Sequence, residues 1–225
     1  MAARLALGLV GVGRIGAFHA QTLLALEDVS SLTIADTNPA RGRRVASELG
    51  AATAETPEAL IDAGVDALVI ATATPAHATL LRLAAQAGLP AFCEKPVALE
   101  LATMDRVREE VARAGILVQV GFQRRFDAGY RAAHEAVAAG GVGRILVMRA
   151  ATHDPVPPPA KYIAASGGIF CDLHIHDFDA VRFVSGEEIT QVYADGVALD
   201  APWVEELEDV DVSAAVLHLS LAAAS

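Results

Sequence analysis

The sequence predicts an α/β protein with a doubly wound parallel sheet, followed by an α+β domain with a mainly antiparallel open sheet. Two observations support this prediction. Short apolar segments alternate with longer amphipathic segments over the first 120 residues, and no helical segment separates the last two alternating segments of the chain. Parallel strands need crossover connections, usually helices, whereas strands without a crossover pair antiparallel. We therefore expect two domains, residues 1–120 and residues 121–225.

The predicted elements of the first domain alternate strand and helix. The candidate strands are Leu5–Val10, Leu32–Ala35, Ala67–Ala71, Pro90–Cys93 and Ile116–Val120. The candidate helices are Ile15–Leu26, Pro39–Leu49, Pro57–Ala63, Ala76–Ala87 and Glu100–Ala114. Two of these helices begin with a capping side chain before a proline at the first helical position, namely Asn38-Pro39 and Thr56-Pro57.

The second domain mixes helices with strands that lack crossovers. Its candidate elements are a helix over Asp127–Ala139, a strand over Arg144–Ala151, a stiff loop over His153–Pro159, a helix over Cys171–Val184, and strands over Ile189–Leu199 and Val210–Leu221. The last two strands are expected to pair antiparallel. Because the chain stops at Ser225 directly after a strand, we expect this domain to be truncated, with an open sheet edge.

Composition excludes several classes of protein. Lysine and arginine total 17 against 28 aspartate and glutamate residues, a net charge of −11, and without a basic tract we expect no nucleic-acid partner. No segment approaches the ~18 uninterrupted apolar residues of a membrane span, and a hydrophobic share of 53% excludes a disordered chain. Glycines interrupt the apolar run after Met1–Arg4, so we interpret it as a strand and turn rather than a secretory signal. With only two cysteines, a cytoplasmic protein is predicted.

A glycine-rich turn, Gly11-Val-Gly-Arg-Ile-Gly16, follows the first predicted strand and opens the first helix. Gly11 allows the tight turn, Gly13 lets the backbone approach a pyrophosphate, and Gly16 lets helix pack on strand. The helix N-terminus, at Arg14 and Ile15, offers free N–H groups to the anion. This pattern in this context is typical of the dinucleotide-binding Rossmann fold.

Asp36 ends the second predicted strand, 20 residues after Gly16. A carboxylate there accepts hydrogen bonds from the adenosine ribose and repels a 2′-phosphate, so NAD is favoured over NADP. Three arginines (Arg41, Arg43 and Arg44) could hold a 2′-phosphate, but we interpret them as the solvated face of the second helix. The alternative is a glycine-rich turn that merely precedes an acidic strand end.

Glu94-Lys95-Pro96 follows the strand at residues 90–93, at the carboxyl edge where open α/β sheets bind ligands. Pro96 favours an extended backbone at Lys95 and so presents the lysine on a loop. Beside a nicotinamide, Lys95 could polarise a substrate oxygen. Taken alone, Lys95 is more typical of a surface charge than of a catalytic residue.

Residues 167–179 hold the densest cluster of titratable groups in the sequence. Asp172 and His176 are four residues apart and therefore neighbours on one helix face, with Asp179 a turn further on. A carboxylate that orients an imidazole is the arrangement of a general base. His174 should point elsewhere on a helix, which argues against a metal site shared with His176. The alternative is an ordinary helix with satisfied polar groups.

Four segments occur in order and at family-like spacing: the glycine turn, Glu94-Lys95-Pro96, residues 121–127 and residues 167–179. Together they resemble the Gfo/Idh/MocA family of NAD(P)-dependent oxidoreductases, and most closely its inositol 2-dehydrogenase branch. The resemblance covers essentially the whole chain. It implies a Rossmann domain and a second domain whose large open sheet mediates homo-oligomerisation. Family members normally continue further, which again implies a truncated chain.

The resemblance also implies roles for individual residues. Lys95, Asp172 and His176 match the family's catalytic positions: His176 takes the proton of a substrate hydroxyl, Asp172 supports it and Lys95 polarises the oxygen. The glycines of the turn and Asp36 match the dinucleotide positions. The further residues expected near the cofactor are Thr72, Pro75, His77 and Glu94, and those matching polyol-binding positions are Arg124, Asp154 and Asp179.

The leading prediction is an enzyme, an NAD-dependent dehydrogenase of a cyclic polyol or sugar, with myo-inositol favoured. The acidic balance disfavours strongly anionic substrates, although Arg124 and Arg125 could hold the carboxylate of a sugar acid. Two alternatives remain open. One is a non-catalytic NAD-binding sensor of the same fold, and the other is an NAD-dependent glycosidase that uses the hydride step transiently.

Overall fold

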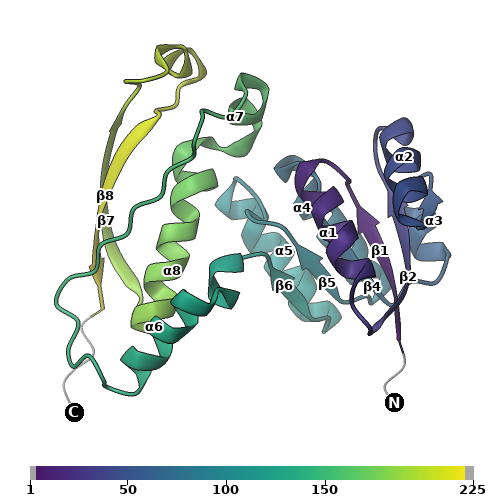
Figure 1. Ribbon diagram of the computed structural model, residues 1–225, viewed down its shortest axis with the longest axis horizontal. Helices are drawn as coiled ribbons and strands as arrows, with labels where there is room; N and C mark the ends of the chain where they lie inside the picture. Colours follow the sequence, from purple (N-terminus) through teal and green to yellow (C-terminus); the bar gives the residue numbers. More distant parts are fainter. Residues whose placement is uncertain (1–3, 221–225) are drawn as a thin grey trace. The chain divides into compact units, whose positions relative to one another are not determined.

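The computed structural model describes residues 4–220, which form two compact units with their boundary between Gly121 and Phe122 (Figure 1). The first unit is a six-stranded parallel sheet in the order β3-β2-β1-β4-β5-β6. Its strands are β1 (Leu5–Val10), β2 (Val29–Ala35), β3 (Ala52–Ala54), β4 (Ala67–Ile70), β5 (Ala91–Cys93) and β6 (Val118–Val120). This order confirms the predicted doubly wound sheet, and it reverses direction between β1 and β4.

Helices alternate with these strands close to the predicted positions. They are α1 (Arg14–Leu24), α2 (Pro39–Leu49), α3 (Pro57–Asp62), the short 3₁₀ helix η1 (Thr74–Ala76), α4 (His77–Ala87) and α5 (Leu101–Ala114). The predicted caps are present: the Asn38 side chain accepts from the Arg41 N–H, and the Thr56 hydroxyl accepts from the Ala59 N–H. The sequence prediction missed β3, because its Ala-Thr-Ala sequence lacks the large apolar residues that indicated the other strands.

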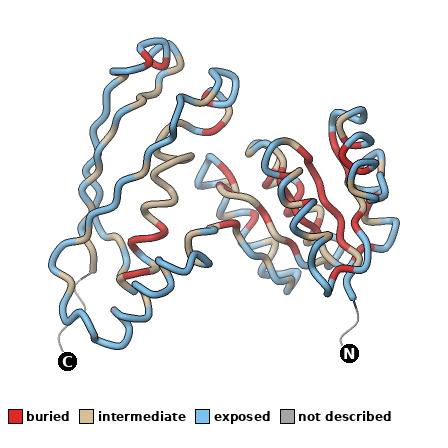
Figure 2. The backbone as a smooth tube through the Cα atoms, viewed as in Figure 1, coloured by how far each residue is buried: buried red, intermediate tan, exposed pale blue. Residues whose placement is uncertain are grey.

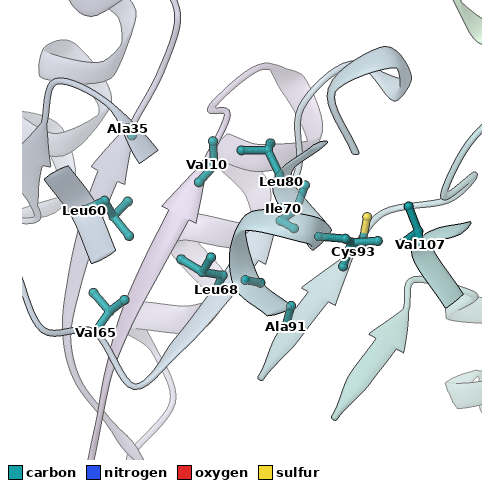
Figure 3. Packing of buried hydrophobic residues seen from close by; sticks show 12 residues of the cluster. Val10, Ala35, Leu60, Val65, Leu68, Ile70, Leu80, Ala91, Cys93 and Val107 are labelled. Atoms are coloured by element: carbon teal, nitrogen blue, oxygen red, sulfur yellow. The ribbon is translucent and has the colours of Figure 1, made fainter. Parts of the chain in front are cut away.

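Two buried apolar clusters cover the two faces of this sheet. Figure 3 shows one of them, and Figure 2 marks the buried residues along the backbone. Leu9 of β1 faces the cluster that includes Ala20 of α1 and Val45 of α2. Val10, the next residue, faces the other cluster, which contains residues of α3, α4 and α5. This alternation follows from the two-residue period of a strand. Because both faces of the sheet are covered, the loops at its carboxyl edge are the part of the sheet open to a ligand.

Up to residue 220, the second unit contains three α-helices, three shorter helical segments and a hairpin. Its elements are the 3₁₀ helix η2 (Gln123–Phe126), α6 (Ala128–Ala138), α7 (Ala160–Ser166), the π-helical turn η3 (Phe170–His174), α8 (Ile175–Ser185), β7 (Ile189–Val197), the 3₁₀ helix η4 (Pro202–Leu207) and β8 (Val212–Leu219). β7 and β8 pair antiparallel, as predicted. The end of the last predicted strand, at residue 221, lies outside the described residues.

The structure of this unit differs from the prediction in three places. The strand predicted over Arg144–Ala151 is absent, and Leu146 is 83% exposed, so this segment has neither a ladder partner nor a buried face. The helix α7 was missed, although Gly167 ends it in a left-handed conformation, a common C-terminal signal. The helix predicted over residues 171–184 begins as a π-helical turn and only then becomes the α-helix α8. No helix within residues 4–220 is long and apolar enough to cross a membrane.

Candidate functional site

The glycine turn between β1 and α1 is shaped by close backbone packing. Gly11 has a φ of +89°, and a Cβ there would lie 2.8 Å from the Ala71 carbonyl oxygen. A Cβ on Gly16 would lie 2.0 Å from the Gly11 carbonyl oxygen, so only glycine lets α1 start this close to β1. A Cβ on Gly13 would meet no atom within 4 Å. Gly13 therefore faces open space, as expected of the position where a pyrophosphate approaches the backbone.

The N-terminus of α1 is left uncapped by side chains. Gly13 is its N-cap residue and provides no side-chain acceptor, and the first turn contains no acidic residue. The first N–H groups of a helix have no partner within the helix, and they lie at the positive end of its dipole. Arg14 and Ile15 therefore belong to a helix end that suits an anion, and their role in binding a dinucleotide stays a prediction.

Asp36 lies at the end of β2, beside the glycine turn, and its side chain is only 1% exposed. It accepts hydrogen bonds from the Val12 N–H at 2.8 Å and the Asn38 N–H at 2.7 Å. Arg41 adds two more, from Nε at 3.1 Å and Nη2 at 2.8 Å. Burial pushes the pKa of Asp36 upward, but these hydrogen bonds and the charge of Arg41 outweigh it, so the net pKa lies below the ordinary value.

The position of Arg41 corrects the prediction that it belongs to a solvated helix face. Its side chain is 40% exposed, and its guanidinium forms an ion pair with Asp36. Together with the two backbone donors, it occupies the carboxylate that would bind the adenosine ribose. The glycine turn and the uncapped end of α1 fit a dinucleotide, and binding of its ribose to Asp36 requires that Arg41 release part of the carboxylate.

Of the residues expected on the nicotinamide side, His77 occupies a different environment from the one predicted. It is the first residue of α4 and only 1% exposed, so its ring offers almost no surface to a ligand. Its Nδ1 lies 2.7 Å from the Pro96 carbonyl oxygen and its Nε2 lies 3.0 Å from the Thr72 carbonyl oxygen. Thr72 is half-buried, while Pro75 is exposed in η1.

Glu94 and Lys95 follow β5 at the carboxyl edge of the sheet, and both are half-buried. One carboxylate oxygen of Glu94 lies 2.7 Å from Nε2 of His19, which is on α1. The peptide bond between Lys95 and Pro96 is cis. Sequence reasoning missed His19, because nothing near it in the chain marks it as a partner of a residue 75 positions away.

In the second unit, Asp172 lies in the π-helical turn and His176 in the first turn of α8. The Tyr162 hydroxyl donates to Asp172 Oδ1 at 2.8 Å, and the ring of Phe122 meets that of His176 edge-on, with centroids 6.5 Å apart. His174 takes another direction, as predicted, since its Nε2 lies 2.7 Å from the Ser213 hydroxyl on β8. Tyr162 is a candidate that the sequence did not reveal, because the helix α7 was not predicted.

Two arginine–aspartate pairs hold the start of this unit to α8. Arg124 donates to Asp177 at 2.5 Å and to the Thr152 hydroxyl at 2.7 Å. Arg125 holds the buried carboxylate of Asp179 through three hydrogen bonds of 2.6 to 3.1 Å. This engagement weighs against Asp179 and Arg124 as substrate ligands, a role that stays a prediction for both.

A cavity of about 1110 Å³ lies within the second unit, between α8 and β8. Asp172 and the exposed Asp154 line it, together with mostly apolar residues of the coil over 145–158 and of β8. His176 is not among the described residues that line this cavity. The size of this cavity alone therefore does not make it the substrate site.

The glycine turn, the helix N-terminus and the acidic end of β2 together define a dinucleotide-binding protein of the Rossmann type. The family model described as "Oxidoreductase family, NAD-binding Rossmann fold" matches residues 5–122, and the GFO/IDH/MocA C-terminal domain matches residues 130–223. The chain therefore belongs to the Gfo/Idh/MocA family of oxidoreductases, which confirms the resemblance seen in its motifs.

Similar proteins of known name include several inositol dehydrogenases. The chain is 41% identical over 214 residues to the myo-inositol 2-dehydrogenase of Thermotoga maritima, covering 94% of this chain and 64% of that protein. It is 38% identical to the scyllo-inositol 2-dehydrogenase (NAD(+)) of Bacillus subtilis, covering 96% and 64%. A scyllo-inositol dehydrogenase from Lactobacillus casei, solved with NAD(H) and scyllo-inositol, matches with a TM-score of 0.82 and 27% identity, covering 96% and 66%. The chain thus spans less than two thirds of the curated relatives' length.

Proposed function

We propose that this chain is the core of an NAD-dependent dehydrogenase that oxidises a secondary hydroxyl of a cyclic polyol or sugar, with myo-inositol favoured. The observation that carries the proposal is the open backbone at Gly13, next to an uncapped helix end and the carboxylate of Asp36. The names of the relatives support the substrate class. Residues 1–120 would form the dinucleotide-binding domain and residues 121–225 the substrate and oligomerisation domain.

Each predicted catalytic residue would have a distinct task. NAD, when bound, supplies the acceptor for the hydride that leaves the substrate carbon. His176 would accept the proton of the same hydroxyl, since an imidazole near neutral pH is an effective general base. Asp172, held by the Tyr162 hydroxyl, would orient and stabilise the protonated ring. Lys95 would donate to the oxygen and stabilise its developing negative charge.

The proposed substrate is neutral and rich in hydroxyls. The net charge of −11 disfavours strongly anionic molecules. The two arginines that could have held a carboxylate are engaged by Asp177 and Asp179, which weighs against a sugar acid. A cytoplasmic homo-oligomer remains part of the proposal.

The test follows NADH absorbance at 340 nm with NAD and a panel of polyols that includes myo-inositol and scyllo-inositol, alongside calorimetric titration with NAD. Lys95→Ala and His176→Ala should each lower kcat by about 10²–10⁴-fold, the range of general acid–base catalysis, while NAD affinity stays close to that of the parent. Lys161→Ala removes the only other lysine, which lies on α7, and serves as the control.

Three outcomes would contradict the proposal. Unchanged turnover in both variants would refute the assigned roles. NAD binding without NADH from any polyol would favour the non-catalytic sensor. Release of free sugar from a glycoside without net NADH would identify a glycosidase.

A further inference from the structure

Two histidines from different helices hold the residues on either side of Lys95. His19 on α1 contacts Glu94, which precedes the lysine, and His77 at the start of α4 contacts Pro96, which follows it. All of these residues belong to the first unit. Neither histidine faces the substrate hydroxyl in the proposed mechanism, so their arrangement needs another explanation.

His77 bridges two loops at the carboxyl edge of the sheet. One of its nitrogens faces the Thr72 carbonyl beyond β4, and the other faces the Pro96 carbonyl beyond β5. Carbonyl oxygens only accept hydrogen bonds, so a neutral ring can donate to just one of them, and both contacts become hydrogen bonds when both nitrogens carry protons. Because the ring is buried, water cannot easily replace either contact.

His19 forms the second attachment. Its ring packs edge-on against Phe92 of β5, with centroids 5.4 Å apart, and its Nε2 lies 2.7 Å from Glu94. The two side chains are only 23% and 20% exposed, so this contact is partly shielded from water. The backbone of Gly121 lies close to the other carboxylate oxygen of Glu94, since a Cβ added to Gly121 would lie 3.1 Å from Oε2.

We propose that His19 and His77 are positioning residues that fix the backbone around Lys95 and thereby the place of its ammonium group. The proposal rests on the proposed function only in giving Lys95 a substrate oxygen to contact. A lysine has a flexible four-carbon side chain, so the position of its charge depends on a fixed backbone and on what surrounds it. Displacement of a catalytic group by about 1 Å can cost about 10²-fold in rate.

The chain offers an unusually direct test, because it contains only two lysines, Lys95 and Lys161. Reductive methylation with ¹³C-formaldehyde labels both amines and keeps their charge. NMR then reports each one without NAD or substrate. Lys161→Arg assigns the signals, and the N-terminal amine is recognised by its lower pKa. In the parent, the signal of the half-buried Lys95 should differ from that of the exposed Lys161 in chemical shift and in line width.

The decisive variants are His19→Ala and His77→Gln. In each, the Lys95 signal should move toward that of Lys161 and sharpen, while circular dichroism shows a folded protein. His134→Gln is the matched control, since His134 also holds a backbone carbonyl at 2.7 Å, that of Phe183 in the second unit. It should leave the Lys95 signal unchanged. If His77→Gln does not fold, His19→Ala decides, because partial exposure lets water solvate Glu94 in that variant.

Kinetics separate this inference from the proposed function. Both variants should lower kcat by about 10²-fold or less, with little change in the KM for NAD, if displacement of Lys95 is the cause. A Lys95 signal that stays unchanged in the folded variants, or that coincides with Lys161 in the parent, would overturn the inference even if the enzyme turns over. A Lys95 signal that responds while the parent oxidises no polyol would support the positioning and reject the proposed function.

Discussion

Replacing Gly13 and Gly16 separately by alanine should split folding from nucleotide binding. At Gly16 the new Cβ would lie 2.0 Å from the Gly11 carbonyl oxygen, whereas carbon–oxygen contacts normally begin at about 3.3 Å. The backbone must therefore move by more than about 1 Å, and overpacking of this kind costs about 1–3 kcal/mol. We expect a cost at the upper end of that range, because the clashing atom belongs to the backbone, which cannot change rotamer as a side chain can.

At Gly13 the same methyl group meets no protein atom within 4 Å, and the φ of −64° is one that alanine adopts readily. Stability should therefore change by less than about 1 kcal/mol, since alanine caps a helix less well than glycine but restricts the unfolded chain. The methyl group would, however, occupy the space proposed for the pyrophosphate. Loss of one charge-assisted hydrogen bond, about 1.5–3 kcal/mol, would weaken NAD binding by about 10–100-fold.

The assays are urea unfolding followed by circular dichroism and calorimetric titration with NAD. The expected pattern is a destabilised Gly16→Ala protein and a stable Gly13→Ala protein that binds NAD poorly. A Gly13→Ala protein with parental NAD affinity would refute the assignment of the pyrophosphate to this turn. A Gly16→Ala protein as stable as the parent would refute the packing argument.

Four further results are expected. Arg41→Ala should raise the preference for NAD over NADP in calorimetric titrations, because the substitution frees Asp36 and removes a positive charge near the position proposed for the ribose 2′ group. A lowered preference for NAD would contradict this expectation. Asp36→Asn should be less stable than the parent at pH 7. Because the folded-state pKa of Asp36 is lowered, the difference in stability should be fully present above its unfolded pKa of about 3.9 and vanish as the pH falls through the folded-state pKa. A difference in stability that is constant down to pH 2 would count against this expectation. Burial and, to a smaller extent, the charge of Glu94 raise the pKa of the Cys93 thiol to about 12. In a Cys171→Ser variant, Ellman's reagent at pH 8 should therefore react with Cys93 only when the protein unfolds. Rapid reaction of the native protein would contradict this expectation. Leu68→Ala, at a fully buried position, should lower the free energy of unfolding by about 2–5 kcal/mol, and a loss below about 1 kcal/mol would show that the core tolerates the cavity.

The first unit was predictable because its local signals and its packing agree. The apolar run at residues 5–10, the Asn38-Pro39 cap and the glycine turn each predict what the fold then uses. The second unit gave less reliable signals. Residues 145–151 have the composition of a strand, yet strand formation depends on a neighbouring edge that a local pattern cannot supply.

The sequence could indicate only those candidate site residues whose separation along the chain is fixed by local structure. Gly16 and Asp36 are recognisable because their separation is fixed by one strand–helix–strand unit. The partners that fix Asp36, Glu94 and Asp172 are side chains whose identity follows from the tertiary fold, namely Arg41, His19 and Tyr162. Arg41 was misjudged because an exposed helical arginine looks the same in sequence whether or not a carboxylate lies beside it.

The lengths of the outer strands have a consequence for aggregation. The first sheet ends in β3 and β6, each only three residues long, and such short edges give another chain little to pair with. The hairpin strands β7 and β8 have nine and eight residues, and each has one edge that pairs with no other strand within residues 4–220. Tyr193 on β7 is 71% exposed, so apolar surface accompanies one of these edges. Intermolecular strand pairing at high concentration should therefore begin at the hairpin, while the nucleotide-binding sheet is protected by the shortness of its own borders.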